Sequence, residues 1–145
     1  MVTLEELKKL LKSYTAICRE IERLQNEIKK IQETYADINA VNLDGMPKSN
    51  RATSHIENVV VNMLTLKDKY AEMLDNAISN KIEIENIIES IKDATGKIIL
   101  QYRFLDNYTF ERIAELTHYS TRQVINIYNN TLKSLTIEKS IFKGK

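Results

Sequence analysis

Hydrophobic residues recur along most of this chain at alternating intervals of three and four. Residues 3–38 carry two such sets, and the members of each set are seven residues apart. The sets are Leu7, Tyr14, Ile21, Ile28 and Tyr35, and Leu10, Ile17, Leu24, Ile31 and Ile38. A seven-residue repeat places an apolar stripe along an α-helix and is typical of coiled coils. The pattern predicts one helix over residues 3–38 with a partner helix along its length.

A second segment, residues 53–92, continues the same repeat. Its two sets are Ile56, Met63, Tyr70, Ala77, Ile84 and Ile91, and Val59, Leu66, Met73, Asn80 and Ile87. Residues 39–52 lie between the segments and contain turn-forming Asp, Gly and Pro residues, so we expect a loop there. Two helices of matched length joined by one loop predict an antiparallel coiled-coil hairpin over residues 1–92. Asn80 is either a buried residue that fixes register or a solvated one where the contact frays.

The pattern changes after residue 92, where shorter apolar segments alternate with turn residues. Asp93 is placed to cap a helix over about residues 95–105. Thr109 and Ser120 are N-cap candidates for two further helices, separated by residues 117–120. Their inward stripes are predicted to be Phe110, Ile113, Ala114 and Leu116, and then Val124, Ile127, Thr131, Leu132 and Leu135. We therefore expect a second domain at 93–136 and a flexible basic tail at 137–145.

Two short helices joined by a tight turn form a helix-turn-helix, whose second helix enters the DNA major groove. The side chains expected to contact DNA are Ser120, Thr121, Arg122, Gln123, Asn126, Asn130 and Lys133. Arg122 suits a guanine edge, and Gln123 or Asn126 an adenine edge. Ser120, Thr121, Asn130 and Lys133 suit phosphates, which position a protein without specifying sequence. For Tyr119 and Tyr128, packing and phosphate contact are both open.

The stretch from Tyr108 to Leu135 resembles region 4 of bacterial sigma factors. Thr109-Phe110-Glu111 match the start of the first helix, Ser120 stands before the recognition helix, and residues 132–135 (LKSL) match its end. Residues 98–105 (IILQYRFL) match the helix that precedes the motif. Where the family carries Arg next to Gln, this chain has Ile125 and Asn126, so the family's promoter specificity is not implied. Ile125 is a candidate contact for a thymine methyl group or for a protein partner.

The whole chain is also similar to phage-encoded late-transcription regulators of the ArpU and RinA type. These have a long helical N-terminal part, a loop containing Gly-Met-Pro (Gly45-Met46-Pro47 here) and a sigma-like C-terminal motif. The resemblance implies a sequence-specific transcription regulator of phage or prophage origin that acts with host RNA polymerase. Two alternatives stay open: a small terminase subunit for DNA packaging, and a helix-turn-helix module that binds protein.

Charge is distributed unevenly along the chain although the net charge is only +1. Residues 1–93 carry 13 basic and 16 acidic side chains, whereas residues 94–145 carry 8 and 4. Positive charge on the segment with the predicted helix-turn-helix favours contact with double-stranded DNA. A second copy of the chain is another expected partner, because Leu4, Leu11, Val60 and Leu74 lie off the predicted hairpin contact.

The sequence offers little for catalysis, for cofactors or for membranes. His55 and His118 have no metal-ligating neighbours at suitable spacing, and three glycines cannot form a phosphate-binding loop. Cys18 is expected to pack rather than to react. The chain has no apolar run near the ~20 residues of a membrane span and no signal-peptide pattern. We therefore expect a cytoplasmic protein that is not an enzyme and uses no metal or cofactor.

Overall fold

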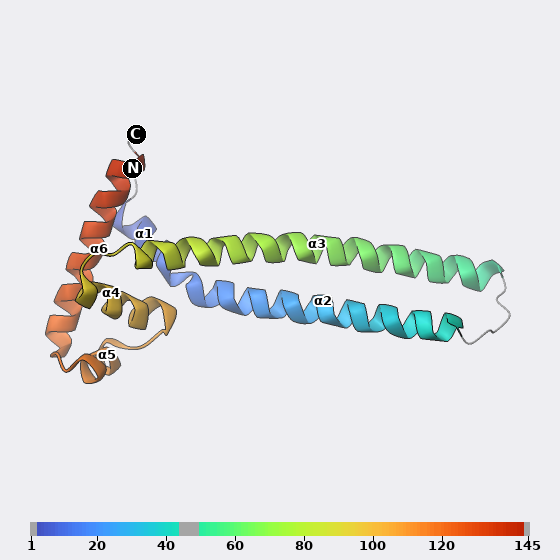
Figure 1. Ribbon diagram of the computed structural model, residues 1–145, viewed down its shortest axis with the longest axis horizontal. Coiled ribbons are helices and arrows are strands. Elements are labelled where there is room, and N and C mark those ends of the chain that lie inside the picture. The colour runs from blue at the N-terminus through green and yellow to red at the C-terminus, as the bar shows by residue number, and fades with distance from the viewer. Residues whose placement is uncertain (1–2, 44–49, 144–145) are drawn as a thin grey trace. The chain divides into compact units, whose positions relative to one another are not determined.

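The computed structural model describes residues 3–43 and 50–143, and every regular element in these ranges is helical (Figure 1), which confirms the all-α class. The elements are α1 Leu4–Lys12, α2 Tyr14–Leu43, α3 Asn50–Glu89, α4 Ala94–Leu100, the π-helix η1 Gln101–Leu105, α5 Phe110–Thr117 and α6 Thr121–Lys143. α2 and α3 both extend into the segment 39–52, where a loop was predicted. Residues 44–49, with the Gly-Met-Pro element, lie outside the described ranges.

The chain divides into two compact units. The first, here called the core unit, consists of residues 1–18 and 80–145, and the second, the arm unit, consists of residues 19–79. This boundary differs from the one expected between residues 92 and 93. The reason is that α1 and the last turns of α3 belong to the same hydrophobic core as the C-terminal helices.

The prediction of one continuous helix over residues 3–38 is wrong at Ser13, which separates α1 from α2. The Ser13 hydroxyl donates to the Leu10 carbonyl at 2.5 Å, and its backbone N–H lies 3.2 Å from the carbonyls of both Lys9 and Leu10. A serine hydroxyl bonded to a backbone carbonyl competes with regular helical bonding and bends or ends a helix. A heptad pattern records only apolar positions, so it gives no sign of this break.

Helix α1 packs against α6 inside the core unit. Leu7 and Leu11 are 1% and 0% exposed and belong to one cluster with Leu132 and Leu135. The other buried members of the cluster are Tyr14, Ile84, Ile87, Ile88, Ile91, Ile99, Leu100, Phe104, Ile113, Ala114, Val124 and Tyr128. Cys18 is half-buried against the same cluster, in agreement with a packing role. Asn80 is exposed, which favours the solvated alternative for that residue.

The helix expected over residues 95–105 consists of α4 and the π-helix η1. Asp93 caps α4 as predicted, since its Oδ2 accepts from the Gly96 N–H at 2.9 Å. In η1 the Asp106 N–H donates to the Gln101 carbonyl at 3.1 Å, five residues back, so one extra residue is fitted into the turn. Gly96 brings α4 close to α6, because a Cβ atom at this position would overlap the Thr131 hydroxyl.

The arm unit buries far less of its apolar surface. Of its described side chains, only Leu24 and Ala77 are buried, and the remaining heptad positions are half-buried or exposed. Glu20 accepts hydrogen bonds from the Arg23 guanidinium at 3.1 and 2.8 Å and raises the pKa of Arg23, and Tyr70 adds to this effect. Figure 1 draws α2 and α3 alongside each other. Within the described ranges, none of the helices combines the length and apolarity needed to cross a membrane.

Candidate nucleic-acid interface

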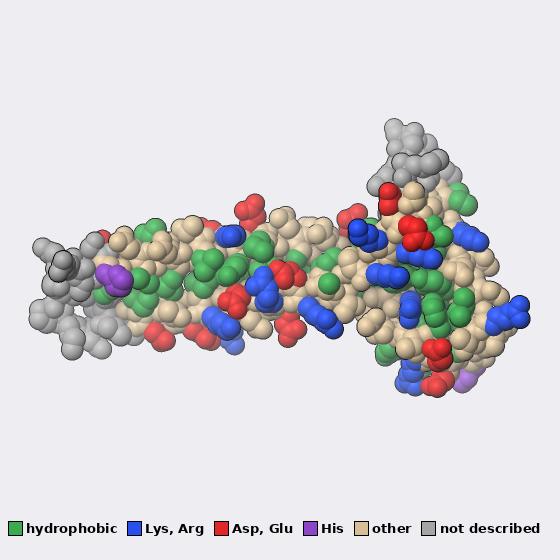
Figure 2. All heavy atoms as spheres, turned by 180° about the vertical axis from the view of Figure 1, so that it is seen from behind, with side chains coloured by type: hydrophobic (Ala, Val, Ile, Leu, Met, Phe, Trp, Pro, Cys, Tyr) green, Lys and Arg blue, Asp and Glu red, His purple; other side chains and the backbone are tan. Residues whose placement is uncertain are grey.

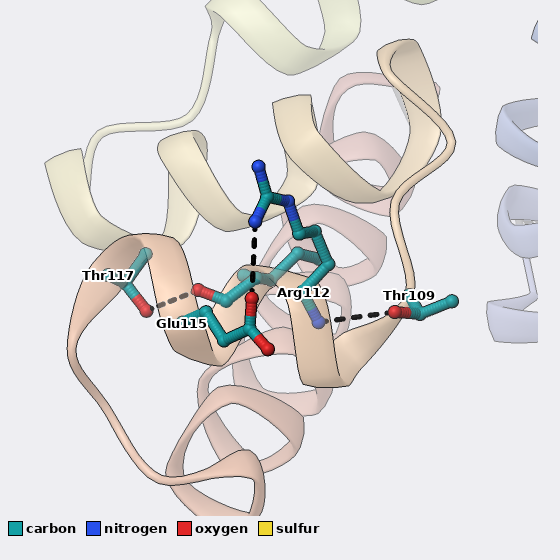
Figure 3. A network of polar contacts seen from close by, with 5 residues as sticks. Thr109, Arg112, Glu115 and Thr117 are labelled. Carbon is teal, nitrogen blue, oxygen red and sulfur yellow. Dashed lines mark hydrogen bonds and ion pairs between the residues drawn. The ribbon is translucent and has the colours of Figure 1, made fainter.

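Helices α5 and α6 are joined by a turn of three residues, 118–120, one fewer than predicted because Thr117 still belongs to α5. Thr109 caps α5 by accepting from the Arg112 N–H at 3.1 Å (Figure 3). His118 ends α5 in the left-handed conformation, with φ 62° and ψ 19°. Left-handed backbone at a helix end reverses the chain direction sharply. The chain can therefore enter α6 after only two more residues.

One residue of the predicted α5 stripe is misplaced. Ile113 and Ala114 are buried and Phe110 is half-buried, but Leu116 is 38% exposed. The buried face continues instead at Thr117, which is three residues after Ala114 and four after Ile113. The Thr117 hydroxyl donates to the Ile113 carbonyl at 2.7 Å (Figure 3), so its polar group is satisfied locally.

The first turn of α6 is fixed by a capping box between two predicted DNA ligands. The Ser120 Oγ accepts from the Gln123 N–H at 3.1 Å, and the Gln123 Oε1 accepts from the Ser120 N–H at 3.0 Å. This reciprocal pair satisfies two backbone donors that a helix start leaves free. Gln123 therefore has a structural role, and its side-chain nitrogen still carries donors for a ligand.

The inward face of α6 follows the predicted stripe. Val124, Thr131, Leu132 and Leu135 are buried and Ile127 is half-buried. Tyr128, for which two roles were open, is 7% exposed and is a packing residue. Its ring lies 5.8 Å from that of Phe104 and 5.0 Å from that of Phe110, measured between centroids. Burial raises the pKa of the Tyr128 hydroxyl, and nearby Arg103 opposes this effect.

The opposite side of α6 is polar and open to solvent. Of the predicted contact residues, Thr121 is half-buried and the other six are exposed: Ser120, Arg122, Gln123, Asn126, Asn130 and Lys133. Asn129 is exposed as well and was not among the predicted contacts. Arg122, Asn126, Asn129 and Lys133 follow one another at intervals of four, three and four, so they form one stripe, here called the outward face of α6. That spacing is the signal from which Asn129 could have been included.

The outward face carries positive charge without acidic neighbours along its own helix. From Thr121 to Ile137 the sequence of α6 contains no Asp or Glu. Among the described side chains, the ion pairs involve neither Arg122 nor Lys133. Asn130 differs from these residues, because it lines a cavity of about 270 Å³ that Lys92, Asp93 and Glu138 also line.

Arg103 connects η1 to the start of α5. Its guanidinium carbon lies 4.2 Å from the centre of the Phe110 ring, and its Nη1 donates to the Tyr108 carbonyl at 3.0 Å. The rings of Tyr102 and Tyr108 are stacked at 5.6 Å. A cation over an aromatic ring contributes roughly 0.5–2 kcal/mol, depending on how far it is removed from water. Arg103 therefore helps to hold α5, and through α5 the turn into α6.

α6 extends further than predicted, since it continues to Lys143 and includes most of the segment expected to form a frayed tail. Among the described residues, no group of His, Cys, Asp and Glu side chains is arranged to hold a metal ion. Comparisons with protein-family models, curated proteins and solved structures found no match to this chain.

Proposed function

We propose that this chain is a sequence-specific DNA-binding transcription regulator of phage or prophage origin. In this proposal α5 and α6 form a helix-turn-helix, and the first turns of α6 enter the major groove. The observation that carries the proposal is the outward face of α6, where Arg122, Asn126 and Lys133 are exposed on a helix free of acidic residues as far as Ile137. A face that only needed solvation would favour Glu and Lys, which form helices better than Asn does.

The side chains on this face have distinct proposed roles. Arg122 binds a guanine edge through two donors, and Asn126 binds an adenine edge. Lys133 binds a phosphate, because an ammonium group is a point charge that does not distinguish bases. Ser120 and Gln123 fix the start of α6 through their capping box, so that Arg122 is presented in a defined position.

We also propose that α2 and α3 form an antiparallel hairpin through which two copies associate and that the regulator acts with host RNA polymerase. The course of α2 and α3 alongside each other supports the pairing of the two helices (Figure 1). Val61 and Leu64 are 60% and 43% exposed, so a second copy would cover apolar surface that one hairpin leaves open. Light scattering should give the mass of a dimer; a large ring would favour the terminase alternative. The proposed contact with RNA polymerase rests on the resemblance to sigma region 4.

The direct test is selection of bound duplexes from a random pool, followed by fluorescence anisotropy on a selected and a scrambled duplex. Arg122→Ala should weaken binding to the selected duplex by roughly 1–3 kcal/mol and relax the base preference at one base pair. Lys133→Ala should weaken both duplexes equally and lower the salt slope by about 1. Lys69→Ala is the matched control, because it removes an exposed lysine from the arm unit.

Two outcomes would contradict the proposal. If Arg122→Ala and Lys133→Ala both fold and bind like the parent protein, the outward face of α6 is not the contact surface. If the parent protein binds no duplex even at low salt, the module that binds protein becomes the better account.

A further inference from the structure

The capping box at the start of α6 holds the side-chain amide of Gln123 in one orientation. The Gln123 Oε1 accepts from the Ser120 N–H at 3.0 Å and from the Ser120 hydroxyl at 3.3 Å. A backbone N–H can only donate, so the end of the amide that faces it must be the oxygen and not the nitrogen. The capping box therefore fixes which end of the amide is turned toward Ser120.

The same two bonds leave the Gln123 amide with donors alone. A carbonyl oxygen has two lone pairs, and the two Ser120 groups use both. Among the described residues, the hydrogen bonds of this side chain involve its oxygen only, so both N–H groups of Nε2 remain for a ligand. Gln123 is exposed and lies three residues before Asn126, so the two side chains are neighbours on the surface of α6. The free donors thus lie at the edge of the outward face.

A donor-only amide cannot make the pairing by which a glutamine recognises adenine. In that pairing the amide oxygen accepts from the N6 amino group of adenine, and the amide nitrogen donates to N7. Guanine differs from adenine because its N7 and O6 atoms both accept. Recognition of adenine by Gln123 would therefore require the capping box to open, whereas recognition of guanine uses the donors that the capping box leaves free.

Basic side chains elsewhere on the core unit do not supply this discrimination. Figure 2 shows several Lys and Arg side chains on the face of the core unit that it displays. Such charges attract phosphates, which repeat on every nucleotide, so they add affinity for DNA of any sequence. In the proposed complex, base preference therefore comes from hydrogen bonds such as those of the Gln123 amide.

We infer that Gln123 is a specificity residue that selects a guanine edge and rejects adenine. The first turn of α6 then reads two guanines, one through Arg122 and one through Gln123, and Asn126 keeps its proposed adenine contact. This inference rests on the proposed DNA-binding function and replaces the adenine edge that the sequence suggests for Gln123. It assigns one side chain two tasks, because the oxygen of the amide caps α6 while its nitrogen contacts the base.

The experiment compares the full-length parent protein with Gln123→Glu in selection of duplexes from a random pool. A Glu carboxylate can take the place of the amide oxygen in the capping box, so thermal unfolding of Gln123→Glu should match that of the parent protein. The carboxylate has no donor, and its second oxygen suits the amino group of cytosine. Gln123→Glu should therefore shift the preference at one selected guanine toward cytosine, by about tenfold.

A second measurement changes the DNA and leaves the protein intact. That guanine is replaced by an analogue in which a C–H group stands in place of N7, and binding is followed by fluorescence anisotropy. The analogue should weaken binding of the parent protein and leave binding of Gln123→Glu unchanged. Asn130→Asp is the matched control for charge, because it also turns an exposed amide of α6 into a carboxylate. It should weaken binding to all duplexes without changing a base preference.

Three outcomes would overturn the inference. If the parent protein selects an adenine whose preference Gln123→Glu relaxes, or if Gln123→Glu keeps every base preference of the parent protein, the role of Gln123 is refuted. The proposed function then stands, provided that Arg122→Ala still relaxes the preference at its own base pair. If the parent protein binds no duplex at low salt, the proposed function fails and this inference fails with it.

Discussion

The core unit and the arm unit differ in what happens to the same kind of apolar pattern. In the core unit α1, the end of α3 and the C-terminal helices bury a single large cluster around Leu11, Ile88 and Leu132, each of which is fully buried. In the arm unit only Leu24 and Ala77 are buried among the described side chains. A stripe buried from several sides stabilises a fold by itself, whereas a half-buried stripe needs a partner to complete it. The core unit therefore holds α6 in place through a shared cluster, whereas the arm unit leaves apolar surface open, as the proposed association of two copies requires.

The largest expected effect concerns the burial of α1 in the hydrophobic core of the core unit. Leu11→Ala removes a side chain that is 0% exposed and should lower the free energy of unfolding by roughly 2–5 kcal/mol, as cavity-forming substitutions do. Leu64→Ala, at a residue that is 43% exposed in the arm unit, should cost much less. Urea unfolding followed by circular dichroism gives both values. Equal losses for the two variants would abolish the contrast between the units.

A smaller effect concerns the close approach of α4 to α6. In a helix Ala is favoured over Gly by about 1 kcal/mol, so Gly96→Ala would stabilise an open position. Here the new Cβ would overlap the Thr131 hydroxyl, and overpacking of this kind costs roughly 1–3 kcal/mol. Gly96→Ala should therefore destabilise the protein in thermal unfolding, and adding Thr131→Ala should recover much of the loss. If Gly96→Ala is more stable than the parent protein, α4 and α6 are packed less tightly than in the structure.

Alkaline pH should lower the stability of the core unit, because Tyr14 becomes ionised. Burial, and then the neighbouring Cys18, raise the pKa of Tyr14 to about 12 from 10.0, so folding favours the neutral phenol. The resulting stability is fully present below the unfolded pKa near 10 and is lost as pH rises toward 12. Between about pH 9 and about pH 11 the free energy of unfolding of the parent protein should fall by roughly 1.4 kcal/mol more than that of Tyr14→Phe.

Tyr35→Phe is the control for this measurement, because Tyr35 is an exposed tyrosine of the arm unit. The unfolding free energies of Tyr14→Phe and Tyr35→Phe are compared with that of the parent protein from about pH 9 to about pH 11. Identical behaviour of Tyr14→Phe and Tyr35→Phe would show that Tyr14 is not held in its neutral form by the core.

The smallest expected effect concerns the start of α6. Ser120→Ala removes the capping box and should cost about 1 kcal/mol of stability. Ser134→Ala, at an exposed serine further along α6, should cost nothing, because Ala is the better helix former. Thermal unfolding of both variants distinguishes a cap from an ordinary surface serine.

Several local features of the molecule could be predicted from its sequence. Thr109, Ser120 and Asp93 cap their helices, and Val124, Leu132 and Leu135 face inward, as expected. These features depend on neighbours within one or two turns, so a single sequence contains the information they need.

The tertiary partner of each stripe could not be predicted in the same way. Leu7 and Tyr14 continue the heptad pattern of Ile21 without interruption, yet they belong to the cluster that contains α6. The break at Ser13 and the extra residue in η1 depend on hydrogen bonds to particular carbonyls, which apolar periodicity does not encode. Tyr128 is a packing residue because its ring lies against those of Phe104 and Phe110, which belong to other elements. The sequence alone does not place these rings beside Tyr128.

We propose that the core unit carries the DNA-contacting surface and that the arm unit does not. The most direct measurement is the change in backbone amide chemical shifts of the full-length protein when a selected duplex is added. We predict that the largest changes fall on residues 120–133, with little change on residues 24–39 and 55–76. Largest changes on the residues of the arm unit, with residues 120–133 unaffected, would contradict the account.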